Sequence, residues 1–197
     1  MHETHQFPEH RSVVSHALSF IGELVRFALV AAVIVIPIRM FVAQPFIVSG
    51  ASMVPTFENG DYLIVDELSY NLGSPERGDV AIFKYPLDQT KYFIKRVIGL
   101  PGETLAVVDG TVTVTTTDGD TVELDEPYLR SISNETFTVT LGADEYFVLG
   151  DNRTNSSDSR TWGALPRELL VGKAFVRLLP ITEIEYQPGK HEFLVTE

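Results

Sequence analysis

An apolar run near the N-terminus constrains this chain more than any other feature of its sequence. Residues 27–38 contain no polar side chain, and further apolar residues extend the run at both ends. Arg26 and Arg39 flank the run, and their long side chains can reach the two interfaces of a bilayer, which lengthens the segment to about residues 21–41. The pattern predicts a single transmembrane helix.

Two other structures are compatible with part of this pattern. A buried helix of a soluble core has the same composition, and a cleaved signal peptide has a similar order of charged and apolar residues. A cut after Ala43 would place Phe41 at the −3 position, where a small residue is needed. An uncleaved membrane anchor therefore fits better than a cleaved signal peptide.

The flanking charges predict the orientation of the anchor. Arg11 and Arg26 precede the apolar run, whereas only Arg39 follows it closely, and positive residues favour the cytoplasmic side. We expect a single-pass protein of the cell membrane, with a cytoplasmic tail over residues 1–19, an anchor over residues 20–43 and an extracytoplasmic domain over residues 44–197.

Composition excludes several kinds of chemistry. The chain has 15 basic and 27 acidic residues, so its net charge is 15 − 27 = −12, which argues against nucleic acid as a partner. It has no cysteine, which excludes disulfides, a thiolate nucleophile and cysteine-bound zinc. The histidines of the N-terminal tail lack the spacing of metal ligands. Covalent catalysis would therefore need Ser, Thr or Lys, and we predict no metal.

The remainder of the chain is predicted to be mainly β. Short β-branched and aromatic runs alternate with glycine, proline and aspartate, and they predict strands over residues 62–65, 79–83, 92–98 and 146–149. Asp109-Gly110 and Asp118-Gly119 predict hairpin turns in an acidic, Thr-rich stretch. We expect this stretch, about residues 106–141, to form a small inserted β subdomain, and we expect one further short helix near Pro166.

Ser52 is the first candidate for a catalytic residue. It lies shortly after the apolar run, in a turn-forming segment in which small residues leave room for a peptide and Pro55 stiffens the backbone. Backbone N–H groups in such a loop can face a developing oxyanion. The alternative is a serine that only caps a turn, and Ser52 alone does not decide between the two.

Lys95 is the candidate for a general base. It shares a strand face with Phe93 and Val97, and a lysine between apolar neighbours loses hydration, which favours the neutral amine. The alternative is an exposed Lys95-Arg96 pair on an edge strand, since Ile94 and Ile98 flank Arg96 in the same way. Only a side chain that pairs with Lys95 would decide between a buried general base and an exposed surface lysine.

A third polar cluster follows the predicted strand at residues 146–149. Residues 150–163 alternate acidic, basic, amide and hydroxyl side chains, which suits either a surface loop or a hydrogen-bonded network that fixes other loops. A calcium loop using Asp151, Asn152 and Asp158 is a further alternative. Arg153 and Arg160 lie between or beside these residues and disfavour a cation.

Together these residues resemble the bacterial type I signal peptidases of the Ser/Lys class. The resemblance covers nearly the whole chain after residue 20 and includes the N-terminal anchor. Four motifs occur in the family's order. They are Ser52-Met53-Val54-Pro55-Thr56, Gly60-Asp61, Arg77-Gly78-Asp79-Val80 with Lys95-Arg96-Val97-Ile98-Gly99-Leu100-Pro101-Gly102, and Gly150-Asp151-Asn152-Arg153 through Ser159-Arg160.

The resemblance implies a role for each matching residue. Ser52 would be the nucleophile and Lys95 the general base, with the Ser156 hydroxyl orienting the lysine amine. The supporting residues implied are an Asp158–Arg160 ion pair together with Arg96 and Asp151, which would shape the site. Gly50 stands where one branch of the family has an oxyanion-binding serine, so the Ser52 N–H would carry more of that task and the second donor stays open.

The resemblance also implies a substrate and a binding mode. A membrane-anchored serine endopeptidase would remove signal peptides from preproteins delivered by the secretion machinery, with no cofactor and with membrane lipid around its anchor. The substrate would add a strand, and small residues at −1 and −3 would enter pockets lined by Phe46, Met53, Phe57, Phe93 and Ile94. Two alternatives are a non-enzymatic anchored β domain that assists secretion and a self-cleaving repressor-like Ser/Lys peptidase.

Overall fold

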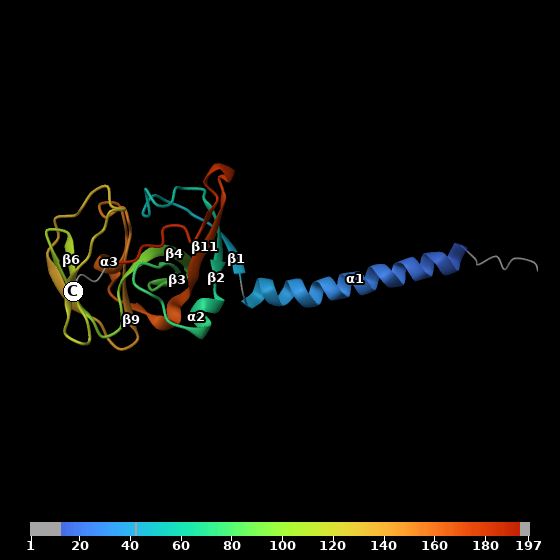
Figure 1. The fold of residues 1–197 in the computed structure, drawn as a ribbon, viewed down its shortest axis with the longest axis horizontal. Coiled ribbons are helices and arrows are strands. Elements are labelled where there is room, and N and C mark those ends of the chain that lie inside the picture. Colours follow the sequence, from blue (N-terminus) through green and yellow to red (C-terminus); the bar gives the residue numbers. More distant parts are fainter. Residues whose placement is uncertain (1–12, 42, 194–197) are drawn as a thin grey trace, which may run out of the picture. The chain divides into compact units, whose positions relative to one another are not determined.

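The computed structural model describes residues 13–41 and 43–193 of the chain (Figure 1). The chain divides into two units, Met1–Phe41 and Val42–Glu197. The first twelve residues, which include Arg11 and three of the four tail histidines, lie outside the described residues. The predictions for that part of the tail therefore stay predictions.

The first unit is one helix, α1, over Val13–Phe41. The helix begins at Val13, so residues 13–19 of the predicted cytoplasmic tail form its first turns, and the boundary between tail and anchor stays a prediction. Those residues include neither glycine nor proline, so the helical hydrogen bonds of the apolar run extend without a break. The window His16–Val35 has a mean hydropathy of 2.2 and is long enough to cross a membrane.

The second unit is built on two antiparallel sheets, so the chain is mainly β with one N-terminal apolar helix, as predicted. The larger sheet has the strand order β1-β2-β11-β3-β4-β9-β10, and β12 pairs with β11. Its strands are β1 (Ala43–Ile47), β2 (Tyr62–Asp66), β3 (Val80–Tyr85), β4 (Asp88–Gly99), β9 (Glu145–Leu149), β10 (Leu165–Pro166), β11 (Leu170–Leu179) and β12 (Glu185–Tyr186).

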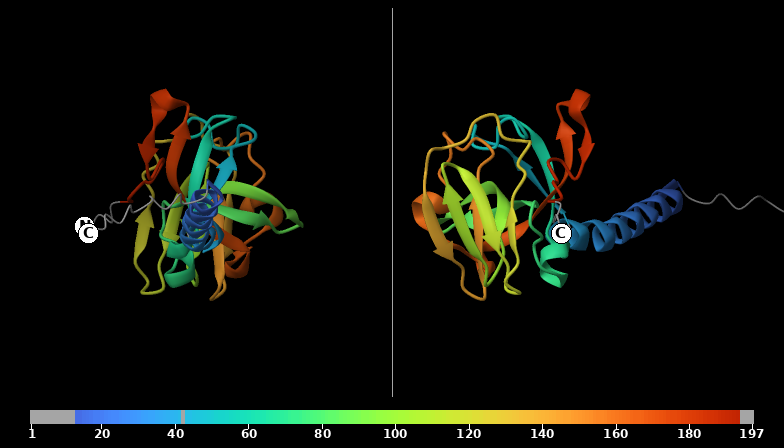
Figure 2. Two further views of the ribbon diagram at one scale, coloured as in Figure 1. Left: turned by 90° about the vertical axis from the view of Figure 1, so that its right-hand side faces the viewer. Right: turned by 60° about the vertical axis from the view of Figure 1, so that its left-hand side comes forward.

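The smaller sheet has the order β7-β6-β5-β8 and lies at the end of this unit away from β1 and β2 (Figure 2). Its strands are β5 (Thr104–Val108), β6 (Thr111–Thr115), β7 (Thr121–Glu123) and β8 (Phe137–Thr140). Asp109 and Gly110 both have positive φ, 48° and 83°, which is the geometry that a tight hairpin turn requires. Buried Leu and Val alternate with less buried residues along β5 and β6, so one face joins a buried core and the other is more exposed.

Short helices complete the second unit. They are α2 (Leu68–Leu72), α3 (Ser159–Trp162) and the 3₁₀ turns Arg167–Leu169 and Ile181–Glu183. The helix expected near Pro166 is only a three-residue 3₁₀ turn, because the chain re-enters the sheet as β11 at Leu170. α2 and α3 were not predicted, since helices of one turn carry no periodic pattern.

Candidate active site

The loop between β1 and β2 carries Ser52 and is fixed at both ends. At its base the Val48 N–H donates to the Asp61 carbonyl and the Gly60 N–H donates to the Val48 carbonyl, both at 2.9 Å. Inside the loop the Phe57 N–H donates to the Met53 carbonyl at 2.9 Å, and both side chains are buried in the core. The loop therefore presents Ser52 from a rigid base.

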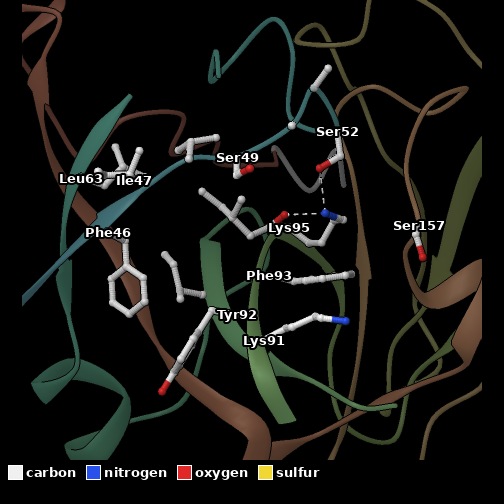
Figure 3. Close-up of a pocket in the computed structure, with 15 residues that line it drawn as sticks. Phe46, Ile47, Ser49, Ser52, Leu63, Lys91, Tyr92, Phe93, Lys95 and Ser157 are labelled. Atoms are coloured by element: carbon white, nitrogen blue, oxygen red, sulfur yellow. Dashed lines mark hydrogen bonds between the residues drawn. The ribbon is translucent and has the colours of Figure 1, made fainter. Parts of the chain in front are cut away.

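Lys95 lies on β4, which is an interior strand between β3 and β9. The side chain is almost fully buried, at 4% exposed, and its amine contacts the ring of Phe93 at 5.2 Å from the centroid. The Lys95 Nζ lies 2.8 Å from the Ser52 Oγ and 2.7 Å from the Ile94 carbonyl oxygen (Figure 3). The alternative of an exposed pair on an edge strand is wrong, because both Lys95 and Arg96 are buried.

Burial lowers the pKa of Lys95 from 10.5 to about 8, although the carboxylates of Asp158 and Asp151 act in the opposite direction. A substantial fraction of the amines is therefore neutral in mildly alkaline solution. A neutral amine at 2.8 Å can accept the Ser52 hydroxyl proton and thereby activate the oxygen as a nucleophile.

Arg96 and Asp151 form a buried ion pair beside the dyad. The Arg96 Nε and Nη2 donate to the two Asp151 carboxylate oxygens at 2.9 and 2.6 Å. The Thr56 hydroxyl also donates to Asp151, which connects the carboxylate to the loop that carries Ser52. Arg96 donates further to the Gly78 carbonyl at 3.0 Å and to the Gly189 carbonyl. Counting the segments that carry Arg96 and Asp151 themselves, the pair thus joins five separate segments of the chain.

The segment Gly150–Asn152 holds the backbone of the nucleophile. The Asn152 N–H donates to the Ser52 carbonyl at 2.9 Å, and the Asn152 side-chain amide donates to the Ala51 carbonyl at 3.0 Å. Gly150 is required here, because a Cβ at that position would lie 2.5 Å from the Ser52 carbonyl oxygen. Displacing this segment would displace Ser52.

Asp158 fixes the other end of the same polar loop. It accepts from the Gly150 N–H at 3.0 Å and from the Arg160 Nε and Nη2 at 2.8 Å each. Burial alone would raise the pKa of the Asp158 carboxyl, but the hydrogen bonds from Arg160 and Gly150 outweigh it and hold the pKa below its usual value. Asp158 therefore stays charged at neutral pH.

The backbone around Ser52 contains free donors for an oxyanion. The Gly50 N–H is already used, since it donates to the Asn59 Oδ1 at 2.9 Å. Within residues 13–41 and 43–193, the N–H groups of Ala51 and Ser52 donate to no acceptor. The Ser52 N–H is therefore the candidate for the first donor.

A cavity of about 450 Å³ opens beside the dyad. The close-up view shows Ser52 and Lys95 at its edge, with Phe46, Phe93 and Tyr92 along its wall (Figure 3). Residues 46–52 and 91–95 line the cavity together with Leu63, Ile82 and Ser157. An extended peptide can run between these two backbone segments.

Three of the predicted site residues lie elsewhere or act differently. Met53 and Phe57 do not line this cavity, because their side chains point into the core at 1% and 0% exposed. The predicted hydrogen bond from Ser156 to Lys95 is absent. The Lys95 amine contacts the Ser52 hydroxyl and the Ile94 carbonyl, and no hydrogen bond joins it to Ser156 among the described residues.

The structure adds residues that the sequence patterns did not assign. Asn152 binds the carbonyls of Ala51 and Ser52, and its position in the third polar cluster was the only signal. Arg153 donates to the Gly150 carbonyl at 3.3 Å and pairs with Glu126. Asn59 accepts a hydrogen bond from the Gly50 N–H, and the Tyr128 ring contacts Arg96. The sequence patterns assigned a role to neither residue. The structure does not favour the calcium alternative, because the carboxylates of Asp151 and Asp158 are both paired with arginines.

The Arg96–Asp151 pair gives a prediction about stability. Both side chains are 1% exposed, so Asp151→Asn would leave a buried guanidinium without its counter-charge. We expect a loss of roughly 3–5 kcal/mol in the free energy of unfolding. The matched control is Asp88→Asn, which removes the partner of the exposed Lys91 and should change the free energy of unfolding far less than Asp151→Asn does. Chemical denaturation of the detergent-solubilised chain measures both, and equal losses would contradict the prediction.

Comparison with known proteins gives concordant results. A family model described as "Signal peptidase, peptidase S26" matches residues 21–179. Probable signal peptidase I-2 of Synechocystis sp. is 41% identical over 82% of this chain and 75% of its own length, and signal peptidase I of Bacillus caldolyticus is 35% identical over 80% and 91%. The crystal structure of a signal peptidase I from Enterococcus faecalis V583 matches 50% of this chain and 95% of its own, with 35% identity and a TM-score of 0.44.

Proposed function

This chain belongs to the signal peptidase family, peptidase S26, and we propose that it cleaves preproteins with a Ser52–Lys95 dyad. As a member of that family it is a serine endopeptidase that removes signal peptides. The observation that carries the dyad is the 2.8 Å contact between a buried lysine amine and a serine hydroxyl at the edge of a peptide-sized cavity.

The first chemical step forms an acyl-enzyme. Neutral Lys95 accepts the Ser52 proton while the Ser52 oxygen attacks the scissile carbonyl, and the Ser52 N–H stabilises the oxyanion. The Lys95 ammonium then protonates the leaving amine, which is the new N-terminus of the mature protein. The signal peptide stays attached to Ser52 as an ester.

The second step releases the signal peptide. Lys95, neutral again, accepts a proton from water as the water attacks the ester, and it returns a proton to the Ser52 oxygen. Asp158 and the Arg96–Asp151 pair take no part in the bond changes and hold the polar loop that positions Ser52.

The cavity supports a preference for extended substrates with small residues. Main-chain groups of residues 46–50 and 91–94 can pair with a peptide that adds a strand between them. Phe46, Phe93 and Ile94 form the apolar walls, and we propose that they admit small side chains at −1 and −3.

The apolar helix supports a membrane anchor. We propose that α1 spans the bilayer with the N-terminus in the cytoplasm and residues 44–197 outside, since the flanking arginines favour that orientation. An anchor next to the catalytic domain holds the enzyme at the surface where signal peptides emerge, and no cofactor is needed for the reaction.

The orientation can be measured by protease protection. Protease added to cells whose outer layers have been opened should digest the domain that carries Ser52 while the cytoplasmic membrane stays intact. Inverted membrane vesicles are the control, and in them the same domain should be protected. The opposite pattern of protection would contradict the proposed topology.

The function itself is tested by cleavage of a synthetic signal peptide with an Ala-X-Ala site. The detergent-solubilised full chain should cut after the second alanine, as determined by mass spectrometry. The control peptide carries leucine at −1 and −3 and should be cut far more slowly. Absence of cleavage of the Ala-X-Ala peptide by the wild-type chain would overturn the proposal.

A further inference from the structure

We propose that the segment between β7 and β8, residues 125–136, is a positioning arm for the peptidase site, with Tyr128 and Glu126 as its principal positioning residues. This inference rests on the proposed function. None of the arm's residues lines the cavity beside Ser52. The arm instead contacts three arginines, namely Arg96 on β4 and Arg153 and Arg160 in the polar loop of residues 150–163.

Tyr128 contacts the arginine of the buried ion pair. The centre of the Arg96 guanidinium lies 3.9 Å from the centroid of the Tyr128 ring, which is the geometry of a strong cation–π contact in a buried site. Arg96 makes its two hydrogen bonds to Asp151 from this stacked position. The ring therefore restrains movement of the guanidinium perpendicular to its own plane, whereas the hydrogen bonds to Asp151 restrain it within that plane.

Glu126 contacts the second arginine and also Tyr128. Its carboxylate pairs with Arg153, and both side chains are buried, at 6% and 2% exposed. The Tyr128 hydroxyl donates to the same carboxylate at 2.6 Å. Burial raises the pKa of the Tyr128 hydroxyl, so the group stays protonated and keeps donating at the pH where the enzyme works.

The far end of the arm contacts the third arginine. The Arg160 Nη1 donates to the Glu135 carboxylate at 2.7 Å and to the Ser133 hydroxyl at 3.3 Å. Arg160 is also bound to Asp158, which holds the Gly150 N–H. The arm thus acts at both ends of the segment that binds the Ser52 carbonyl.

The arm's own packing agrees with a positioning role. Ile132 is 56% exposed, and residues such as Pro127, Arg130 and Asn134 are exposed as well. Glu126, which pairs with Arg153, is the most deeply buried charged side chain of the arm. A segment this exposed adds little to the core, and besides the contacts of Tyr128 and Asp125 with His191, the ion pairs that it makes go to the arginines.

The test compares four variants of the detergent-solubilised full chain on the Ala-X-Ala peptide. Tyr128→Leu removes the aromatic face, and we expect kcat to fall about tenfold or more with KM within about twofold, because small misplacements of a nucleophile are costly and the cavity is unchanged. Tyr128→Phe keeps the face and should stay within about threefold of wild type. Glu126→Gln should lower kcat about threefold. Tyr186→Leu, at a tyrosine of β12 remote from the cavity, is the matched control and should change nothing.

A second readout separates positioning from a loss of folded protein. The charged groups near the Lys95 amine are Asp151 and Asp158, and its other contacts are the Ser52 hydroxyl, the Ile94 carbonyl and the Phe93 ring. If Tyr128→Leu loosens Arg96, Asp151 is less neutralised and favours the ammonium, so the ascending limb of kcat/KM should move to higher pH. Partial unfolding would lower the whole profile without moving the limb.

The outcomes are distinct. Tyr128→Leu with wild-type kcat and an unmoved limb would overturn the inference, as would equal losses in Tyr128→Leu and Tyr128→Phe. If Tyr128→Leu does not fold, Glu126→Gln decides in its place, and wild-type kcat in that variant would overturn the inference. Failure of the proposed function appears separately, as a wild-type chain that does not cleave.

Discussion

Replacing Ser52 or Lys95 with alanine should lower kcat/KM for an Ala-X-Ala peptide by at least about 10³-fold, and the double variant should be no worse than either single variant. Ser52 supplies the oxygen that attacks and Lys95 the amine that activates it, 2.8 Å away. Because neither group works without the other, the two losses are not additive. Steady-state cleavage of the peptide by the detergent-solubilised chain measures the effect.

Neighbouring residues of the same types provide matched controls. Ser157 lines the same cavity but is not among the hydrogen-bond partners of the Lys95 amine, so Ser157→Ala should keep kcat within about fivefold of wild type. Lys91 also lines the cavity, and its amine pairs with Asp88, so Lys91→Ala should behave similarly. Substantial cleavage by Ser52→Ala or Lys95→Ala, or a similar loss in the controls, would contradict the dyad.

The activity of the wild-type chain should rise with pH up to a plateau. Burial lowers the pKa of Lys95 to about 8, and only the neutral amine accepts the Ser52 proton. We therefore expect kcat/KM to increase about tenfold per unit below pH 7 and to level off above about pH 9. Lys95→Arg should be inactive throughout this range, since a guanidinium stays charged. A flat profile from pH 6 to 9 would exclude Lys95 as the base.

The same pKa predicts how stability depends on pH. In the unfolded chain Lys95 takes up its proton below about 10.5, whereas in the folded chain it does so only below about 8. The buried amine therefore costs stability as pH falls from about 10.5 to 8, and the cost stays at its full value of about 3 kcal/mol below that range.

Lys95→Met removes this cost along with the catalytic amine. At pH 7 the inactive variant should be at least as stable as wild type, because the methionine fills similar space without a charge to bury. Its advantage should shrink as pH rises toward 10.5, because the unfolded wild-type amine also loses its proton there and the difference between the two states disappears. Denaturation curves at pH 7 and 10 measure the difference. A variant that is clearly less stable at pH 7 would show that Lys95 is an ordinary paired cation.

Local patterns in the sequence were sufficient for much of this protein. The apolar run predicted the helix that the structure describes over Val13–Phe41, and alternating residues predicted β2, β3, β4 and β9 to within a few residues. Motif order pointed to the family and singled out Ser52 and Lys95 as candidates. These features depend on residues within one segment, so periodicity, turn chemistry and residue type are enough to read them.

The contacts that assemble the site were decided by tertiary structure. Ser52 and Lys95 are 43 residues apart in the chain, and whether Lys95 lies at an edge or in the interior depends on the pairing of β4 with β3 and β9. Burial, and with it the lowered pKa, follows from that pairing and from the core on each side of the sheet.

The same reason explains the predictions that were wrong or missing. Met53 and Phe57 are apolar like the true lining residues, but their side chains are 1% and 0% exposed and do not border the cavity. Ser156 carries the right hydroxyl, yet the Lys95 amine donates to the Ile94 carbonyl. Tyr128 lies in a segment with no motif, and its contact with Arg96, which is far from it in the chain, depends on the tertiary fold. Residue type and local spacing determine what a side chain is able to do, whereas which partner it meets depends on contacts between segments that are distant in the sequence.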